Sequence, residues 1–539
     1  MDSKLLTEVR AWIADDPDPV TAAQLIALIE SGDEITLRKY FSGFLQFGTA
    51  GLRGPLGPGP SCMNQAVVGR TAAGIVQYMK SRSLTSVVIG RDARHGSNVF
   101  EELSAQIFAG AGFKVSVLPR PLPTPVLAFA VNELAADVGI MVTASHNPGS
   151  DNGYKVYLGG TVDGVNYRGS QIISPADKEI SAEIEKIESL SSIPRAHTWE
   201  ILNEDIVEKY VDRTKVLAPR PGDLKIVYTA MHGVGTKTLQ RVFHRAGFPS
   251  LILVAAQAQP DPDFPTLAFP NPEEVGALDL AFETAQTFDA DLVIANDPDA
   301  DRCSIAVKDR DATWRALRGD EIGAILGESI ARNAKSGTLA NSIVSSSILS
   351  KIAAHHGLDF QETLTGFKYI AKIPHLAFGY EEAIGFCVDA TTVNDKDGIS
   401  AALSIAQIAT DLHGQGKTLL DFLDEIWAVY GFHATEQISI RVADISSIAV
   451  IMSKLRAHPL SEISGFKVLS SDDLSKPRNA LPPTDGLRFV LENNIRIIIR
   501  PSGTEPKIKC YVEIVTSDKS IAHSLLEQLR PSLRELLSK

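Results

Sequence analysis

A serine and a histidine stand together where a predicted strand ends. Ser145 and His146 follow the apolar run 138–142, which is typical of a buried strand bounded by polar residues. The tripeptide 147–149, Asn-Pro-Gly, predicts a turn directly afterwards, because proline fixes φ and glycine permits positive φ. A hydroxyl held on a turn beside an imidazole suits a nucleophile or a phosphoryl carrier. For an isolated Ser-His pair, an ordinary polar strand exit is the commoner explanation.

Three carboxylates occupy alternate positions directly after the predicted strand 291–296: Asp297, Asp299 and Asp301. Such oxygen ligands can converge on a hard cation, Mg²⁺ or Ca²⁺. An EF-hand is excluded, because Arg302 stands where its turn glycine is needed and Lys308 where its bidentate glutamate is needed. Mg²⁺ held by three carboxylates would keep positions for water or a phosphoryl oxygen. A solvated acidic turn is the alternative.

Two more segments carry groups that suit a phosphorylated polyol. Residues 500–507 follow the predicted strand 495–499 and combine an arginine, two hydroxyls and a glycine, which suits a phosphate cradle. Lys507 and Lys509 add charge there, although a simple hairpin turn explains the segment equally well. Residues 378–386 place two adjacent glutamates in an apolar, glycine-flanked setting, which suits sugar hydroxyls or a solvated pair at a strand edge.

Other segments are weaker evidence. Lys396 lies between two aspartates, in a segment that suits either a helix N-terminal cap or a proton-transfer group. The glycine-rich loop 48–54 ends near Arg53 but lacks both the Walker lysine and the dinucleotide-binding spacing. The segment 90–94, Gly-Arg-Asp-Ala-Arg, indicates still less by itself.

The elements that must position these groups read as alternating strands and helices. Strands at 86–90 and 113–118 flank a helix at 99–110, which is the βαβ pattern. After a Pro-Gly break, a second α/β unit opens at 224, and a third starts near 313. The last hundred residues alternate like antiparallel strands between helices, which predicts a small α+β domain.

Composition restricts the class of protein. A chain of 539 residues exceeds one core and should form about three or four domains. The net charge of −13 disfavours nucleic acid or an anionic membrane as partner. The four cysteines are scattered without a CxxC pair, and neither a signal peptide nor a membrane-spanning run is apparent. We therefore expect a soluble, cytoplasmic, multidomain protein with no nucleic-acid or membrane partner.

Five motifs in order carry a resemblance to a known family. The segments are 47–54, 143–148, 297–302, 379–385 and 500–504. With this set the chain resembles the α-D-phosphohexomutase superfamily, closest to its phosphoglucomutase and phosphopentomutase branch. The resemblance implies an α/β fold of four domains around a central cleft, three α/β units with mixed sheets and a smaller C-terminal α+β domain.

The resemblance also implies where the domains and their site loops lie. Residues 1–216 would carry the phosphoserine loop, 217–313 the metal loop, 314–432 the sugar-binding loop and 433–539 the phosphate-binding loop. Ser145 would be the phosphoserine and, with the three aspartates, a ligand of one Mg²⁺. His146, Lys396 and Arg53 would be the other catalytic residues, with the acid and the base not assigned between His146 and Lys396.

Two sets of binding residues follow from the same resemblance. The expected substrate-binding residues are Arg302, Gly379, Glu381, Thr365 and Lys155. The expected phosphate-binding residues are Arg500, Ser502, Gly503, Thr504 and Lys509.

The implied activity interconverts glucose 1-phosphate and glucose 6-phosphate, through a phosphoserine enzyme and a bound bisphosphate. Glucose 1,6-bisphosphate or an equivalent sugar bisphosphate would activate a monomer or weak dimer. Ala383 replaces the serine that many family members carry after the paired glutamates, which leaves the sugar open. Phosphopentomutase and glucose 1,6-bisphosphate synthase are the alternatives. A zinc phosphatase would need clustered histidines, and the sequence shows no such cluster. A pseudoenzyme should have lost an essential group, whereas Ser145 and the three aspartates are all present.

Overall fold

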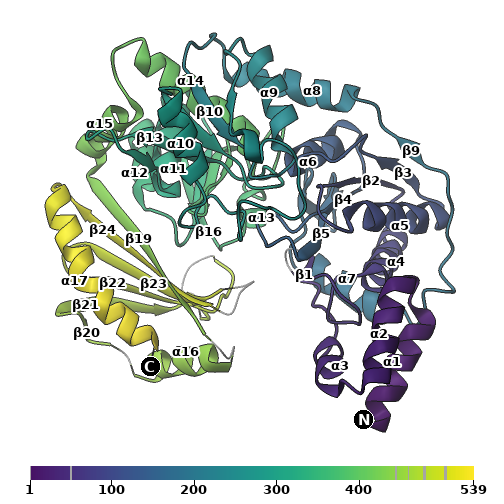
Figure 1. The fold of residues 1–539 in the computed structure, drawn as a ribbon. Coiled ribbons are helices and arrows are strands. Elements are labelled where there is room, and N and C mark those ends of the chain that lie inside the picture. The colour runs from purple at the N-terminus through teal and green to yellow at the C-terminus, as the bar shows by residue number, and fades with distance from the viewer. Residues whose placement is uncertain are drawn as a thin grey trace. The chain divides into compact units, whose positions relative to one another are not determined.

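The computed structural model describes residues 2–48, 51–442, 446–458, 460–476, 481–502 and 507–538 (Figure 1). The chain forms two compact units, each described by itself. The first comprises Met1–Leu317 and Ala383–Asp411, and the second comprises Arg318–Glu382 and Leu412–Lys539.

Three helices open the first unit: α1 (Ser3–Asp15), α2 (Pro19–Ser31) and α3 (Glu34–Tyr40). An aspartate side chain caps the N-terminus of each helix by accepting a backbone N–H of its first turn. Apolar side chains from these helices, among them Val9 and Leu25, join the core of the sheet that follows. The helices therefore extend the first α/β layer.

The first sheet is mixed and has the order β1-β5-β4-β2-β3-β9, with β8 (Ser170–Gln171) also paired to β5. Its strands are β1 (Leu52–Pro55), β2 (Ser86–Arg91), β3 (Lys114–Val117), β4 (Val138–Val142), β5 (Asp151–Leu158) and β9 (Glu200–Ile201). Strands β2, β3, β4 and β9 run parallel, whereas β5 is antiparallel to β4 and β1 to β5. The predicted βαβ pattern is thereby confirmed.

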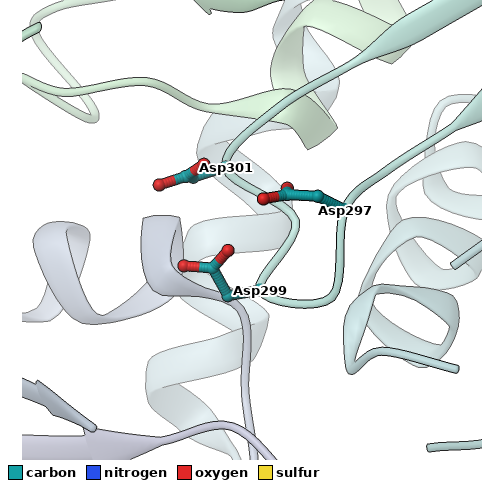
Figure 2. Close-up of side chains that lie close together, drawn as sticks. All are labelled: Asp297, Asp299 and Asp301. Carbon is teal, nitrogen blue, oxygen red and sulfur yellow. The ribbon is translucent and has the colours of Figure 1, made fainter. Parts of the chain in front are cut away.

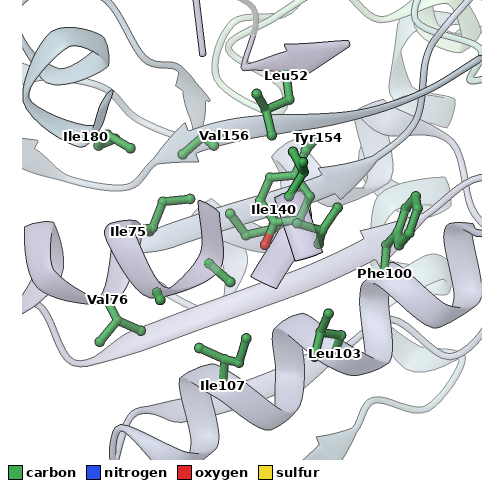
Figure 3. Close-up of a cluster of buried hydrophobic side chains, with 14 of the residues drawn as sticks. Leu52, Ile75, Val76, Phe100, Leu103, Ile107, Ile140, Tyr154, Val156 and Ile180 are labelled. Carbon is green, nitrogen blue, oxygen red and sulfur yellow. The ribbon is translucent and has the colours of Figure 1, made fainter. Parts of the chain in front are cut away.

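Helices cover both faces of this sheet. Helices α4 (Gln65–Ser81) and α5 (Ser97–Gly110) pack their apolar side chains on the face that carries Ile140 (Figure 3). Because neighbouring strand residues point to opposite faces, Gly139 lies on the other face, against Val131 of α6 (Thr124–Glu133). Helix α7 (Ala176–Glu185) packs against α4.

The second sheet has the order β11-β10-β12-β13-β14 and follows α8 (Asp205–Thr214). Its strands are β10 (Ile226–Thr229), β11 (Ile252–Leu253), β12 (Leu292–Ala295), β13 (Ser304–Lys308) and β14 (Trp314–Ala316), with helices α9 (Gly235–Arg245) and α10 (Asp279–Thr287). Strand β14 pairs antiparallel with β13, so this sheet continues past the boundary predicted at 313. The two strands form a hairpin joined by residues 309–313, so the segment that follows β13 supplies the edge strand of this sheet.

In the second unit, the parallel strands β16 (Asp359–Thr363), β15 (Thr338–Ser342) and β17 (Leu376–Glu381) lie side by side in that order. The helices of this layer are α11 (Gly319–Asn333), α12 (Ile348–His356), α13 (Phe367–Ile370) and α15 (Leu419–Tyr430). Strand β18 (Gly385–Cys387) and nearly all of α14 (Gly398–His413) belong by sequence range to the first unit.

The C-terminal part is the expected α+β domain. Its antiparallel sheet has the order β19-β24-β23-β22-β21-β20. The strands are β19 (Phe432–Arg441), β20 (Glu462–Ile463), β21 (Phe466–Asp473), β22 (Leu487–Leu491), β23 (Ile495–Pro501) and β24 (Lys507–Thr516). Helices α16 (Ser446–Ala457) and α17 (Lys519–Ser538) bury their apolar residues on this sheet.

Candidate active site

Ser145 lies on the loop that leaves β4. Its φ of +53° puts it in the left-handed region, which non-glycine residues seldom adopt. The Ser145 N–H donates to Thr143 Oγ1 over 2.9 Å, and the turn closes where Asn147 N donates to Ala144 O over 3.1 Å. The side chain is buried, with 3% of the residue exposed. The predicted turn beside Ser145 is therefore present and holds the hydroxyl inward.

The three alternate aspartates form a tight loop between β12 and β13. One carboxylate oxygen from each of Asp297, Asp299 and Asp301 lies within 4.8 Å of the others, and all three residues are buried (Figure 2). The loop turns at Ala300, whose φ is +55° and whose N–H donates to Asp297 O over 2.8 Å. This burial excludes the alternative of a solvated acidic turn.

The structure brings the serine and the acidic loop together. Ser145 Oγ donates to Asp297 Oδ2 over 2.7 Å, although 152 positions separate the two residues. His146 Nδ1 lies 3.3 Å from the same hydroxyl oxygen. Ser145 Oγ thus contacts a carboxylate directly, whereas the acid of a hydrolase triad would bind and orient the histidine.

Cationic side chains balance the buried carboxylates. Lys155 Nζ, on β5, donates to Asp299 Oδ2 over 2.7 Å and to Asp301 Oδ2 over 2.9 Å. Lys396 Nζ lies 3.3 Å from Asp301 Oδ2. The Lys396 stem crosses Gly385, where a Cβ would approach Lys396 Cδ to 2.3 Å. Glycine at 385 therefore gives Lys396 its path to the acidic loop.

These contacts shift the pKa values of the three aspartates in different directions. Burial raises the pKa of Asp297 well above its usual range, and the carboxylates of Asp299 and Asp301 add to that shift. Burial also opposes ionisation of Asp299 and Asp301, but Lys155 lowers the pKa of both. With Thr124 at Asp299, and Lys396 and Arg302 at Asp301, it brings each pKa below its usual range. Asp297 is thus the carboxyl that most needs a further positive charge.

Arginines and a histidine complete the surroundings of Ser145. Arg53, on β1, donates from Nη1 to Asn147 Oδ1 over 3.3 Å. Arg302 donates its backbone N–H to Asp297 Oδ1 over 3.1 Å, and its Nη1 lies 3.5 Å from Glu273. Burial lowers the pKa of His146 well below its usual range, and the charges of Arg302 and Arg53 lower it further.

The acidic loop fits a divalent cation by its donor set. Asp299 Oδ1 and Asp301 Oδ1 are buried without a hydrogen-bond partner, while the other oxygen of each carboxylate binds Lys155. Buried carboxylate oxygens without a partner are costly, and such oxygens are the ligands that Mg²⁺ prefers. Asp297, Asp299 and Asp301 could therefore each give one oxygen to an ion beside Ser145 Oγ.

The predicted sugar-binding residues lie in the second unit. Glu381 ends β17, and its Oε1 accepts from Gly366 N over 2.7 Å, next to Thr365. Gly379 lies buried within the same strand. Glu382 Oε2 accepts from Ser342 Oγ and Ser345 Oγ over 3.0 and 3.2 Å. The two glutamates of the motif thus contact different parts of this unit.

The predicted phosphate-binding residues of the second unit lie at one end of the β23–β24 pair. Arg500 and Lys509 are register partners, and Ser502 N donates to Lys507 O over 2.8 Å. Gly503 and Thr504 lie outside the described residues. Strands β23 and β24 pair antiparallel here, which places the cationic residues Arg500 and Lys509 side by side.

Two contributors were not identified by their own sequence patterns. Thr124 Oγ1, at the start of α6, donates to Asp299 Oδ2 over 2.5 Å, and Thr124 N donates to Asp299 O over 2.9 Å. Arg94, from the weak segment 90–94, donates to carbonyls of the Ser145 loop. No local signal marks Thr124, because 175 positions separate it from its partner.

Mixed α/β sheets, an antiparallel C-terminal sheet and a serine beside an acidic loop are the features that the resemblance to phosphosugar mutases implies. Family models of phosphoglucomutase/phosphomannomutase match in order: α/β/α domain I at 45–191, II at 205–310, III at 318–430 and the C-terminal domain at 443–531. The chain belongs to this family, within the α-D-phosphohexomutase superfamily, and the predicted family is confirmed.

Several named proteins are similar over nearly their whole length. A probable phosphomannomutase of Haemophilus influenzae is 47% identical, over 88% of this chain and 98% of the relative. The human phosphopentomutase is 36% identical over 100% and 95%, and the mouse glucose 1,6-bisphosphate synthase is 32% identical over 98% and 92%. A phosphoglucomutase/phosphomannomutase family protein of Burkholderia thailandensis shares the fold, with a TM-score of 0.71 and 18% identity over 91% and 97%.

Within the part of the chain that the structure describes, no helix combines the length and apolarity that a membrane crossing needs.

Proposed function

We propose that this phosphosugar mutase transfers a phosphoryl group through Ser145, and that its substrate pair is glucose 1-phosphate and glucose 6-phosphate. The contact between Ser145 Oγ and Asp297 Oδ2, at 2.7 Å inside the acidic loop, carries the proposal. A phosphate on this hydroxyl would stand against carboxylates that already have buried, unpartnered oxygens. Such a place suits a dianion only with a cation present, which agrees with a metal-dependent phosphoryl carrier.

The proposed transfer balances as two reverse halves. The Oγ–P bond of phosphorylated Ser145 breaks as a sugar hydroxyl oxygen forms a new bond to phosphorus, and the hydroxyl proton leaves to a basic group. His146 and Lys396 are the two candidates for that group. The departing Ser145 Oγ takes up a proton, and the resulting bisphosphate turns round. Ser145 Oγ then loses that proton as it bonds to the other phosphorus, whose bond to the sugar oxygen breaks; that oxygen takes up a proton, and the phosphoserine is restored. Arg53 and Arg302 supply positive charge near the transferring group.

Mg²⁺ would be held by Asp297, Asp299 and Asp301 with an oxygen at Ser145. When bound, such an ion neutralises charge on a transferring phosphoryl group. The chain's own contribution is to bury and orient these oxygens, since Lys155 and Thr124 fix the carboxylate of Asp299. Loss of activity on chelation, with recovery on adding Mg²⁺, would support this assignment.

Sugar hydroxyls are proposed to contact Glu381 and Thr365. Further substrate-binding residues are proposed to be Arg302, Gly379 and Lys155.

The phosphate that does not react is proposed to bind a second set of residues: Arg500, Ser502, Gly503, Thr504 and Lys509. The register pairing of Arg500 with Lys509 supports an anion there, because it places two cationic residues on adjacent strands.

A pentose 1-phosphate is the second candidate substrate. The names of relatives that align over the whole chain favour it, among them the human phosphopentomutase. The mouse glucose 1,6-bisphosphate synthase also keeps synthesis of the bisphosphate itself as an alternative. Ala383 gives no hydroxyl for a sugar contact, which is compatible with either sugar.

Two measurements test the proposal. Ser145→Ala should abolish mutase turnover and phosphoryl incorporation, and near-normal activity of that variant would refute the phosphoserine. Comparison of kcat/KM for glucose 1-phosphate, ribose 1-phosphate and deoxyribose 1-phosphate then decides the sugar. A pentose preference above about tenfold, roughly 1.4 kcal/mol of transition-state discrimination, would replace glucose as the substrate.

A further inference from the structure

One arginine binds the backbone of the whole loop that carries Ser145. We call residues 145–151 the nucleophile loop. Arg94 Nη2 donates to Ser145 O over 2.5 Å and to Asn147 O over 2.7 Å. Arg94 Nη1 donates to Pro148 O over 2.7 Å and to Asp151 O over 3.2 Å. Four carbonyl groups of one short loop therefore converge on a single guanidinium, which is 4% exposed at the residue level.

The Arg94 guanidinium is itself fastened to the sheet. Asp92 Oδ2 lies 3.2 Å from Arg94 Nε, and Asp92 Oδ1 accepts from Arg94 N over 3.0 Å. Asp92 N donates to the carbonyl of Val142, the last residue of β4, over 3.0 Å. The same sheet edge therefore holds both the origin of the nucleophile loop and the arginine that binds it.

Residues 262–264 form a second segment that packs against both Arg94 and the nucleophile loop. The Arg94 guanidinium carbon lies 4.9 Å from the centroid of the Phe264 ring. A Cβ at Gly149 would meet Pro262 O at 2.7 Å, so the nucleophile loop also touches this segment directly. The nucleophile loop thus contacts the C-terminal end of β4, Arg94 and residues 262–264. Ser145 keeps its left-handed backbone conformation among these contacts.

We propose that Arg94 is a positioning residue for phosphoryl transfer, which fixes the nucleophile loop so that Ser145 Oγ stays directed at the acidic loop. The inference rests on the proposed function, since it requires Ser145 to carry the phosphoryl group. Arginine suits this task because its planar fork offers five donors at fixed angles, whereas a lysine ammonium cannot reach four carbonyls of one loop together. The guanidinium also adds a buried positive charge beside the backbone of the phosphorylated residue.

The decisive variant keeps the charge and removes the fork: Arg94→Lys. Its matched control is Arg91→Lys, three positions earlier, where the native guanidinium instead pairs with Glu101 at 2.9 Å. We expect Arg94→Lys to slow phosphoryl transfer from glucose 1,6-bisphosphate to dephosphorylated Ser145 by about 100-fold, because a displacement of about 1 Å has that effect on a reacting group. The KM for glucose 1-phosphate should change less than about threefold, and Arg91→Lys should stay within about twofold of wild type in both measurements.

Chemical rescue separates positioning from mere support of the fold. Arg94→Ala should recover at least about tenfold in phosphorylation rate with millimolar guanidinium, and urea at equal concentration should not restore it. Circular dichroism shows which variants are folded. If Arg94→Lys does not fold, the phosphorylation rate is measured on Arg94→Ala instead. A folded Arg94 variant that phosphorylates at the wild-type rate, or equal losses in Arg94→Lys and Arg91→Lys, or no rescue of Arg94→Ala, would overturn the inference. If wild-type Ser145 takes up no phosphoryl group, the proposed function itself fails.

Discussion

Thr124→Val removes the side-chain hydrogen bond that Thr124 donates to the acidic loop at Asp299. Thr124 Oγ1 donates to Asp299 Oδ2 over 2.5 Å, and both residues are at most 1% exposed. A hydrogen bond to a charged, buried acceptor contributes about 1.5–3 kcal/mol. Loss of a residue that hydrogen-bonds a metal ligand typically weakens metal affinity by about 10–100-fold, or roughly 1.4–2.7 kcal/mol. The two values agree, so the predicted loss of Mg²⁺ binding free energy is about 2 kcal/mol, which raises the half-saturating Mg²⁺ concentration about thirtyfold.

The assay is the Mg²⁺ dependence of mutase activity at saturating sugar phosphate. The backbone bond from Thr124 N to Asp299 O survives the substitution, so the loop should keep its path. Thr71→Val is the matched control, because Thr71 is equally buried but its hydroxyl donates to Val67 O within α4. A half-saturating Mg²⁺ concentration within about twofold of wild type in Thr124→Val, or an equal change in Thr71→Val, would refute the reasoning.

Two stability predictions concern other parts of the chain. Burial raises the pKa of Asp320 to about 6, so its contribution to stability is present below about pH 4 and is lost as pH rises through 6. Asp320→Asn can still accept at Oδ1 from Ser346 and Tyr380, and in denaturant titrations it should be about 2–3 kcal/mol more stable at pH 8 and lack this pH dependence; an unchanged pH profile would contradict it. Gly139→Ala places a Cβ 2.5 Å from Val131 Cγ2, so we expect a loss of about 1–3 kcal/mol, and an unchanged melting temperature would argue against that packing.

Much of the local structure was predictable because local patterns encode it. The apolar run 138–142 became β4 with the predicted bounds, and the runs 86–90 and 495–499 became β2 and β23, each slightly longer than predicted. The second sheet extends past residue 313, because β14 pairs antiparallel with β13 through the short connection 309–313. Pairing between strands far apart in the chain, such as β10 with β12, is decided only in the folded sheet, because neither segment by itself encodes its partner.

The sequence by itself determined the residue types of the site and their places at strand ends: a serine on a turn, three alternate aspartates and a lysine before a helix. Only the tertiary structure decided which of them meet. It set Ser145 on Asp297, Lys155 between Asp299 and Asp301, and Arg94 beneath the nucleophile loop. These partners are far apart in the chain: 51 positions separate Arg94 from Ser145, and 152 positions separate Ser145 from Asp297. Sheets bring such distant strand ends together, and burial then requires each charged group to find a partner there.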